Sequence, residues 1–139
     1  MWKSISIMVV ICFLFMTNVH PASAETQTID QKQQPSILER AFPRELGTNI
    51  ILEIMSTKGD NQLYFAPRIE KITRNEANDF YDITLRVIGY EGPMNPPYTL
   101  IHMTIRIPGN DYSKYTVLDY KRRFISDSEL KEFIKFAPD

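Results

Sequence analysis

Cysteine is almost absent from this chain. The single cysteine among 139 residues, Cys12, lies inside an apolar run near the start of the sequence. One thiol forms no intrachain disulfide, and structural zinc sites need several cysteines or histidines at short spacing. We therefore predict a folded domain with no disulfides, no metal site and no thiol chemistry, stabilised by its core alone.

An excess of positive charge is missing as well. The chain carries 16 Lys and Arg residues against 17 Asp and Glu residues, for a formal net charge of −1. Nucleic acids and anionic membranes select clustered positive charge, so we predict no nucleic-acid partner. The longest basic cluster, Lys-Arg-Arg at residues 121–123, is typical of a solvated strand edge.

Catalytic motifs are also missing. The sequence has no phosphate-binding glycine loop, no nucleophile elbow and no H-E-x-x-H. A general base would require His102 to pair with Asp82 or Asp119 across neighbouring strands, but a lone histidine on a strand is more often a solvated side chain. We predict that the protein is not an enzyme, with no catalytic residues, no metal ligands and no cofactor.

The apolar run that opens the chain is too short to span a bilayer comfortably. Lys3 precedes the run at residues 5–16, and Ala-Ser-Ala at residues 22–24 fits the pattern before a signal-peptidase site. We predict a signal peptide over residues 1–24, cleaved after Ala24, with an uncleaved membrane anchor as the alternative. The mature protein would be secreted or associated with the cell wall, with no membrane segment left.

The next segment changes from a polar leader to a helix. Residues 25–35 contain Ile29 as their only large apolar residue, so we predict a flexible polar leader. Ser36 and Glu39 fit the S-x-x-E capping box, and an apolar residue then recurs every four positions. Pro43 predicts a kink in this helix, or two abutting helices, near residues 41–43. Its apolar face consists of Leu38, Phe42, Leu46, Ile50 and Ile54.

From residue 63 the apolar period changes to two, which is typical of strands. We expect strands at residues 63–74, 80–90, 99–107 and 115–124, with Pro67 at an edge or a bulge of the first strand. The inward faces of the two middle strands are Ile83, Leu85 and Val87, and Ile101, Met103 and Ile105.

Residues 36–139 therefore predict a single α+β domain. We expect an N-terminal proline-kinked helix packed on one side of a four-stranded antiparallel meander, and a short C-terminal helix after Asp127. By analogy, this order of elements fits cystatin-like or NTF2-like folds.

Between the two middle strands lies E-G-P-M-N-P-P-Y at residues 91–98, which holds three of the nine prolines. Each proline fixes φ and restricts the residue before it, so the loop is predicted to be rigid. A rigid loop loses little entropy on binding, but it can equally serve as a structural brace. The candidate binding or structural residues are Glu91, Gly92, Pro93, Asn95, Pro96, Pro97 and Tyr98.

This motif, E-G-P-x-N-P-P-Y, resembles that of a family of small exported proteins from Gram-positive spore-forming bacteria, known as a domain of unknown function. The resemblance covers about residues 38–121 and includes the A-F-P-R-E-L of the helix. The chain departs from the family at Thr99, where members often carry a smaller residue. The resemblance implies export but no assigned activity.

The function hypothesis is a secreted or cell-wall-facing, non-catalytic binding module of a bacterium. Its loop at residues 91–98 would contact a protein or cell-envelope partner that the sequence does not identify. The alternative is a small-ligand-binding protein or an enzyme with a pocket between helix and sheet.

Overall fold

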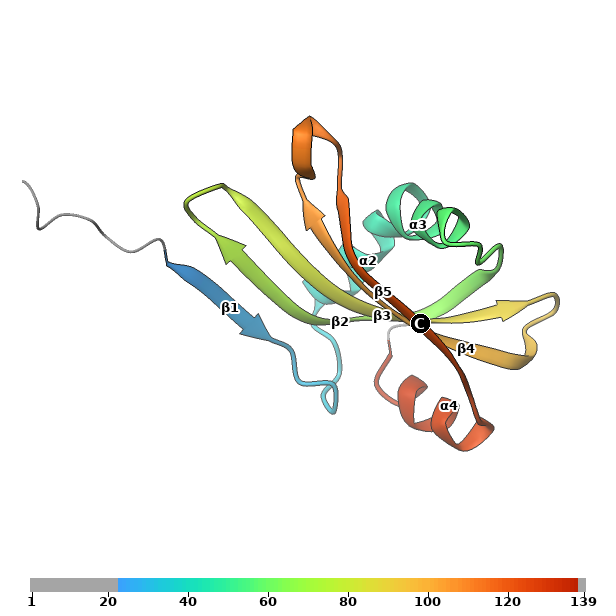
Figure 1. The fold of residues 1–139 in the computed structure, drawn as a ribbon. Helices are drawn as coiled ribbons and strands as arrows, with labels where there is room; N and C mark the ends of the chain where they lie inside the picture. Colours follow the sequence, from blue (N-terminus) through green and yellow to red (C-terminus); the bar gives the residue numbers. More distant parts are fainter. Residues whose placement is uncertain (1–22, 138–139) are drawn as a thin grey trace, which may run out of the picture.

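The computed structural model describes residues 23–137, which form one antiparallel sheet with helices on both of its faces (Figure 1). Cys12 and all but the last two residues of the predicted signal peptide lie outside the described residues. The elements are β1 (Ala24–Thr28), α2 (Ile37–Leu46), a π-helical turn (Gly47–Ile51), α3 (Leu52–Thr57), β2 (Leu63–Asn75), β3 (Phe80–Glu91), β4 (Asn95–Ile107), a 3₁₀ turn (Asn110–Tyr112), β5 (Thr116–Ile125) and α4 (Asp127–Ile134).

The strands follow one another across the sheet in the order β1-β2-β3-β4-β5, and each neighbouring pair is antiparallel. The predicted α+β class is confirmed, but the sheet has five strands rather than the predicted four. No helix within residues 23–137 has both the length and the apolar character needed to cross a membrane.

The additional strand, β1, comes from the segment predicted to be a flexible leader. It pairs with the end of β2, from Ala24 opposite Asn75 to Thr28 opposite Lys71. The backbone N–H of Ile29 then donates to the carbonyl of Glu70 at 2.9 Å. All five β1 residues are exposed, so backbone hydrogen bonds and the partly buried Ile29 order this segment without an apolar face.

The first helix differs from its predicted apolar face. Leu38 is 80% exposed and Phe42 is 37% exposed, whereas Glu39 and Pro43 are buried. The helix continues through Pro43, and the departure from α geometry comes later, at the π-helical turn. A π turn inserts one residue and rotates the helix beyond it, which explains why Ile51, rather than the predicted Ile50, is fully buried.

The main core lies between the sheet and the helical segment from α2 to α3; we call this side the α3 face. The predicted inward residues of β3 and β4 are all buried there, so this part of the prediction is confirmed. The buried cluster consists of Leu46, Ile51, Ile54, Met55, Ile69, Ile83, Leu85, Val87, Ile101, Met103 and Ile105.

The opposite side, which we call the α4 face, is not left open as predicted. Helix α4 crosses it (Figure 1) and covers a small cluster of Ala66, Ile88 and Leu100 with its Leu130 and Phe133. The sheet is therefore covered by helices on both sides, because the short C-terminal helix has an apolar side of its own.

Pro67 lies at a bulge, as predicted. The pairing of β2 with β3 shifts register between Phe65 and Arg68, and Ala66 adopts a positive φ of 51°. The pairing with β1 covers only the far end of β2, from Lys71 onward. Pro67 therefore lies where β2 has no outer neighbour among the described strands, and its missing N–H removes no bond on that side.

Candidate functional site

The loop at residues 91–98 forms the end of the β3–β4 hairpin. Glu91 pairs with Asn95, and the turn between them is exposed. Gly92 has a φ of 64° and Met94 a φ of 55°, and the N–H of Met94 donates to the carbonyl of Gly92 at 2.9 Å. The turn therefore presents Pro93 and Met94 to solvent, and the Met94 side chain is 47% exposed.

The side chain of Tyr98 holds the backbone of this turn in place, and we call this role the brace. Its hydroxyl donates to the carbonyl of Met94 at 2.7 Å. Its ring packs edge-on against Phe65, with 6.1 Å between centroids, and Phe65 makes a similar contact with Tyr90 at 5.7 Å. The ring also joins the small cluster beneath α4. Tyr98 therefore connects the exposed turn to the folded domain.

The predicted motif is divided between two roles. Glu91, Gly92, Pro93, Pro96 and Pro97 are exposed, with a cis bond joining the last two. Tyr98 is partly buried and acts as a brace. The backbone of Asn95 begins β4, and its side chain lies outside the described part of the structure.

The histidine pairings considered from the sequence do not form. The Nε2 atom of His102 lies 3.2 Å from Oε1 of Glu70. Asp82 instead accepts two bonds from Arg106, at 2.8 and 2.9 Å. Asp119 pairs with Lys121 at 2.9 Å. Asp82 and Asp119 are therefore engaged by cations rather than by the histidine, which lies beside Glu70 instead.

Sequence reasoning missed a buried carboxylate, Asp60, which follows the positive-φ Gly59 at the end of α3. Asp60 accepts a hydrogen bond from the Tyr120 hydroxyl at 2.6 Å and another from Arg122. Burial raises the pKa of Tyr120, and the bond to Asp60 raises it further, so this hydroxyl remains a donor. Only a glycine helix cap followed by an aspartate marks the site in the sequence, because its partners lie about sixty residues away.

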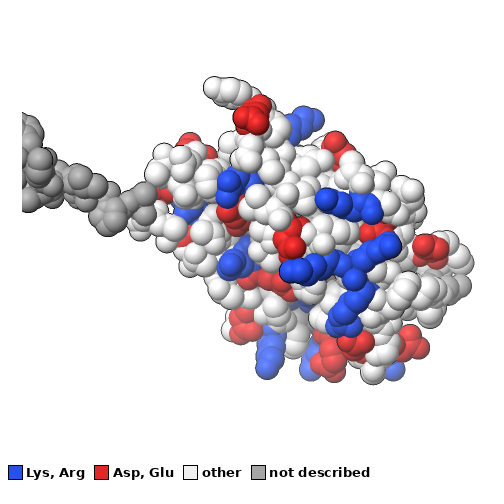
Figure 2. Space-filling view, in the orientation of Figure 1, with Lys and Arg blue, Asp and Glu red and all other residues white. Residues whose placement is uncertain are grey.

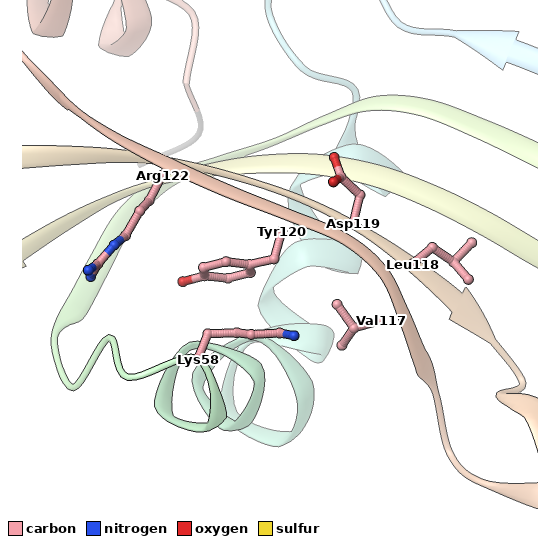
Figure 3. A pocket seen from close by; sticks show the side chains of 6 residues that line it. All are labelled: Lys58, Val117, Leu118, Asp119, Tyr120 and Arg122. Carbon is pink, nitrogen blue, oxygen red and sulfur yellow. The ribbon is translucent and has the colours of Figure 1, made fainter.

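A pocket of about 390 Å³ opens beside this carboxylate, between the end of α3 and β5. Figure 3 shows Lys58 at the end of α3, and Tyr120 and Val117 pointing from β5 to the side that faces the helix. Its charged lining residues are two cations, Lys58 and Arg122, and one carboxylate, Asp119. The lining residues are Lys58, Val117, Leu118, Asp119, Tyr120 and Arg122.

Comparison of the chain with protein-family models, curated proteins and solved structures finds no match in any of the three. The family resemblance of residues 91–98 therefore stays a prediction. Within residues 23–137, no three His, Cys, Asp or Glu side chains lie close enough together to hold a metal ion.

Proposed function

We propose that this chain is an exported, non-catalytic binding module of a bacterium, and that residues 91–98 form its contact surface for a protein or cell-envelope partner. The observation that carries this proposal is the division of the loop into an exposed turn and an internal brace. Met94 and Pro93 face solvent, while Tyr98 holds the backbone of Met94 from below.

A braced turn is suited to recognition because little of its freedom remains to be lost on binding. Ordering a mobile side chain or loop at an interface opposes binding by about 0.5–1.5 kcal/mol per rotamer-rich side chain. Here the turn is fixed by Pro93, by the Met94 N–H bond to Gly92 and by the Tyr98 hydroxyl. The exposed Met94 side chain supplies a flexible apolar contact that adapts to its partner.

The polar side chains of the sheet support a non-catalytic role. A general base needs a free lone pair within reach of a substrate proton. Asp82 is held by two nitrogens of the Arg106 guanidinium, so this carboxylate is not free to orient His102 as a base. These groups are engaged with one another across the strands, as in a solvated sheet surface.

The proposal also includes the finer fold analogy and the place of action. The helical segment packed on one side of an antiparallel meander supports the analogy with cystatin-like or NTF2-like folds. The signal-peptide pattern before Glu25 supports secretion, or retention at the cell wall, of a protein that keeps no membrane segment.

The test begins with the full chain, expressed with a tag after Asp139 in a Gram-positive host. Mass spectrometry of protein from the medium should give Glu25 as the first residue; uncleaved protein held in the membrane would contradict export. The secreted protein is then cross-linked to envelope and medium fractions, beside Met94→Asp and the control Ile37→Asp, which changes a more exposed apolar residue on α2.

Export and contact are judged separately in this experiment. A partner captured by wild type and by Ile37→Asp but lost by folded Met94→Asp supports the loop as the contact surface. Equal capture by all three proteins would show that the loop is only a hairpin end.

The alternative, a small ligand held between helix and sheet, has one supporting observation. Apolar side chains fill most of that interface, but the pocket beside Lys58 and Tyr120 opens at its rim. Val117→Phe would fill this pocket, so a small-molecule ligand found by native mass spectrometry should be lost from that variant. Retention of the ligand would place it elsewhere.

A further inference from the structure

The outer edge of β5 has features that suit it to binding another chain. β5 is ten residues long and pairs through one edge with β4, and it is the last strand in the sheet order. No strand within residues 23–137 pairs with its other edge. A free edge presents a row of N–H and C=O groups at the spacing that an added strand requires.

Three consecutive side chains of this strand are basic, and the carboxylate Asp119 lies two residues before the first of them. Lys121, Arg122 and Arg123 follow one another in β5, and each is more than half exposed. Figure 2 shows Lys and Arg side chains gathered over the part of the surface that β5 crosses. Each of the three has a carboxylate neighbour, but Arg122 and Arg123 retain donors that these single contacts do not use.

The pocket beside Asp60 opens along this edge on the α3 face. Successive residues of a strand point to opposite faces, so Tyr120 and Arg122 border the pocket and Lys121 lies on the α4 face. Lys58 reaches the same pocket from the end of α3 (Figure 3). A strand added to β5 would therefore direct alternate side chains toward two cations.

We propose that the free edge of β5 binds an extended acidic peptide segment of another protein by strand addition, with one of its carboxylates entering the pocket between Lys58 and Arg122. Backbone hydrogen bonds supply the general affinity, and the pocket selects the acidic side chain. Lys121 and Arg123 attract further carboxylates on the α4 face. This site goes beyond the loop contact proposed above and does not depend on it.

A second copy of the chain fits this edge less well than an acidic segment does. Pairing two β5 strands antiparallel relates the copies by a two-fold axis perpendicular to the sheet. Both copies then place Lys58 and Arg122 on the same face beside that axis. Like charges that meet across paired strands are destabilising, whereas an acidic strand would neutralise them.

The test uses a fluorescein-labelled octapeptide of alternating Glu and Val, with a Lys and Val peptide and a fully N-methylated Glu and Val peptide as comparisons. The N-methylated peptide keeps every carboxylate and loses every amide donor. By fluorescence anisotropy with the full chain, we expect the Glu peptide to bind at least about tenfold tighter than either comparison.

Variants of the protein locate the contact. Lys58→Glu should weaken binding of the Glu peptide about tenfold, since the carboxylate then meets like charge. Lys32→Glu makes the same charge change on an exposed residue away from β5, and should leave binding unchanged. Hydrogen exchange should show new protection in residues 116–125 when the Glu peptide is bound.

Four results would overturn the proposal. Equal binding of the N-methylated peptide would indicate side-chain attraction of a polyanion without strand addition. Equal binding of the Lys peptide would show that charge plays no part in recognition. No binding of the Glu peptide at millimolar concentration would show that the edge is not a binding site for such peptides. A dimer by light scattering, with protection confined to β5, would assign the edge to a second copy.

Discussion

The two faces of the sheet are stabilised in different ways. On the α3 face, β3 and β4 contribute apolar side chains to one continuous cluster with the helices. On the α4 face, only a small apolar cluster lies beneath α4, and two arginines, Arg68 and Arg86, are buried beside it. Apolar contact is non-directional, whereas a guanidinium fixes the positions of the groups that it binds.

Arg68 shows what the directional contacts achieve. Its guanidinium binds Glu39 of α2 at 2.8 Å, the carbonyls of Asp30 and Gln33 at 3.3 Å, and the carbonyl of Phe136. One buried side chain thus joins the segment after β1, the first helix and the C-terminal segment. The α3 face stabilises the sheet, and the α4 face determines where the two ends of the domain attach.

Removing Arg68 should have the largest effect. Arg68→Met leaves Glu39 buried without its cation, and breaking a buried pair in this way is expected to destabilise by about 3–5 kcal/mol. Arg106→Met on the same face is the control: its bidentate pair with Asp82 and its stacking on Phe80 are partly solvated, so the loss should be smaller, about 1–2 kcal/mol. Urea unfolding of the two variants compares them directly.

The double variant Arg68→Met with Glu39→Leu sharpens this result. It removes both charges, so part of the lost stability should return, while the carbonyls of Gln33 and Phe136 still lack the donor that Arg68 supplied. Equal stability of Arg68→Met and Arg106→Met would contradict the organising role of Arg68.

A matched pair of leucines compares the apolar parts of the two faces. Leu85 is fully buried in the large cluster, and Leu100 is 2% exposed in the small one. Leu85→Ala should cost about 4 kcal/mol, because the helices and sheet around it cannot close the cavity. Leu100→Ala should cost about 3 kcal/mol, since α4 at the end of the domain can settle into the space.

The free energies of unfolding are measured in urea for both leucine variants. An equal or larger loss for Leu100→Ala would show that α4 is held as rigidly as α3.

The contrast between an apolar face and a face of directional polar contacts explains which parts of the fold could be predicted from the sequence. Residues 83, 85 and 87 and their neighbours on β4 alternate in a long, regular pattern, and the apolar α3 face follows from that pattern. Hydropathy does not reveal that Arg68 is buried, because its burial depends on Glu39 and on carbonyls far away in the chain. β1 was missed because its order comes from backbone pairing, which leaves no side-chain pattern.

Two copies of S-x-x-E show why local sequence does not determine all side-chain contacts. Ser126 and Glu129 form the complete capping box at α4. At α2, Ser36 accepts from the N–H of Glu39, but the Glu39 side chain turns to Arg68 instead of back to the cap. The local motif is the same, and the long-range partner decides which contacts form. In the loop, likewise, the sequence does not reveal the division between exposed turn and internal brace.

The brace of the loop is expected to have a smaller effect on stability. Tyr98→Phe keeps the ring contact with Phe65 and removes the hydroxyl that binds the carbonyl of Met94. The loss should be about 1 kcal/mol, with faster amide exchange in residues 92–95. Tyr112→Phe, at a fully exposed tyrosine, is the control and should change neither quantity. Unchanged exchange in Tyr98→Phe would mean that the prolines alone hold the turn.

The smallest effect is expected at the cap of α4. The N–H of Ser126 holds the pKa of Glu129 below its ordinary value of 4.5, and Arg123 adds to this. Because the folded-state pKa is the lower one, the unfolded chain binds more protons, and stability from this carboxylate is lost as the pH falls from 4.5 through the folded-state pKa.

Urea unfolding across this acidic range should therefore show wild type and Glu129→Gln differing most at the upper end and converging as the pH falls. Glu132→Gln, on the same helix, controls for loss of a charge without loss of the cap. Since the Glu129 side chain is 41% exposed, the difference should shrink in high salt, whereas the effect of replacing the buried Arg68 should change little. If the difference in free energy of unfolding between wild type and Glu129→Gln stays constant with pH, the capping box acts through its hydrogen-bond geometry and not through the charge of Glu129.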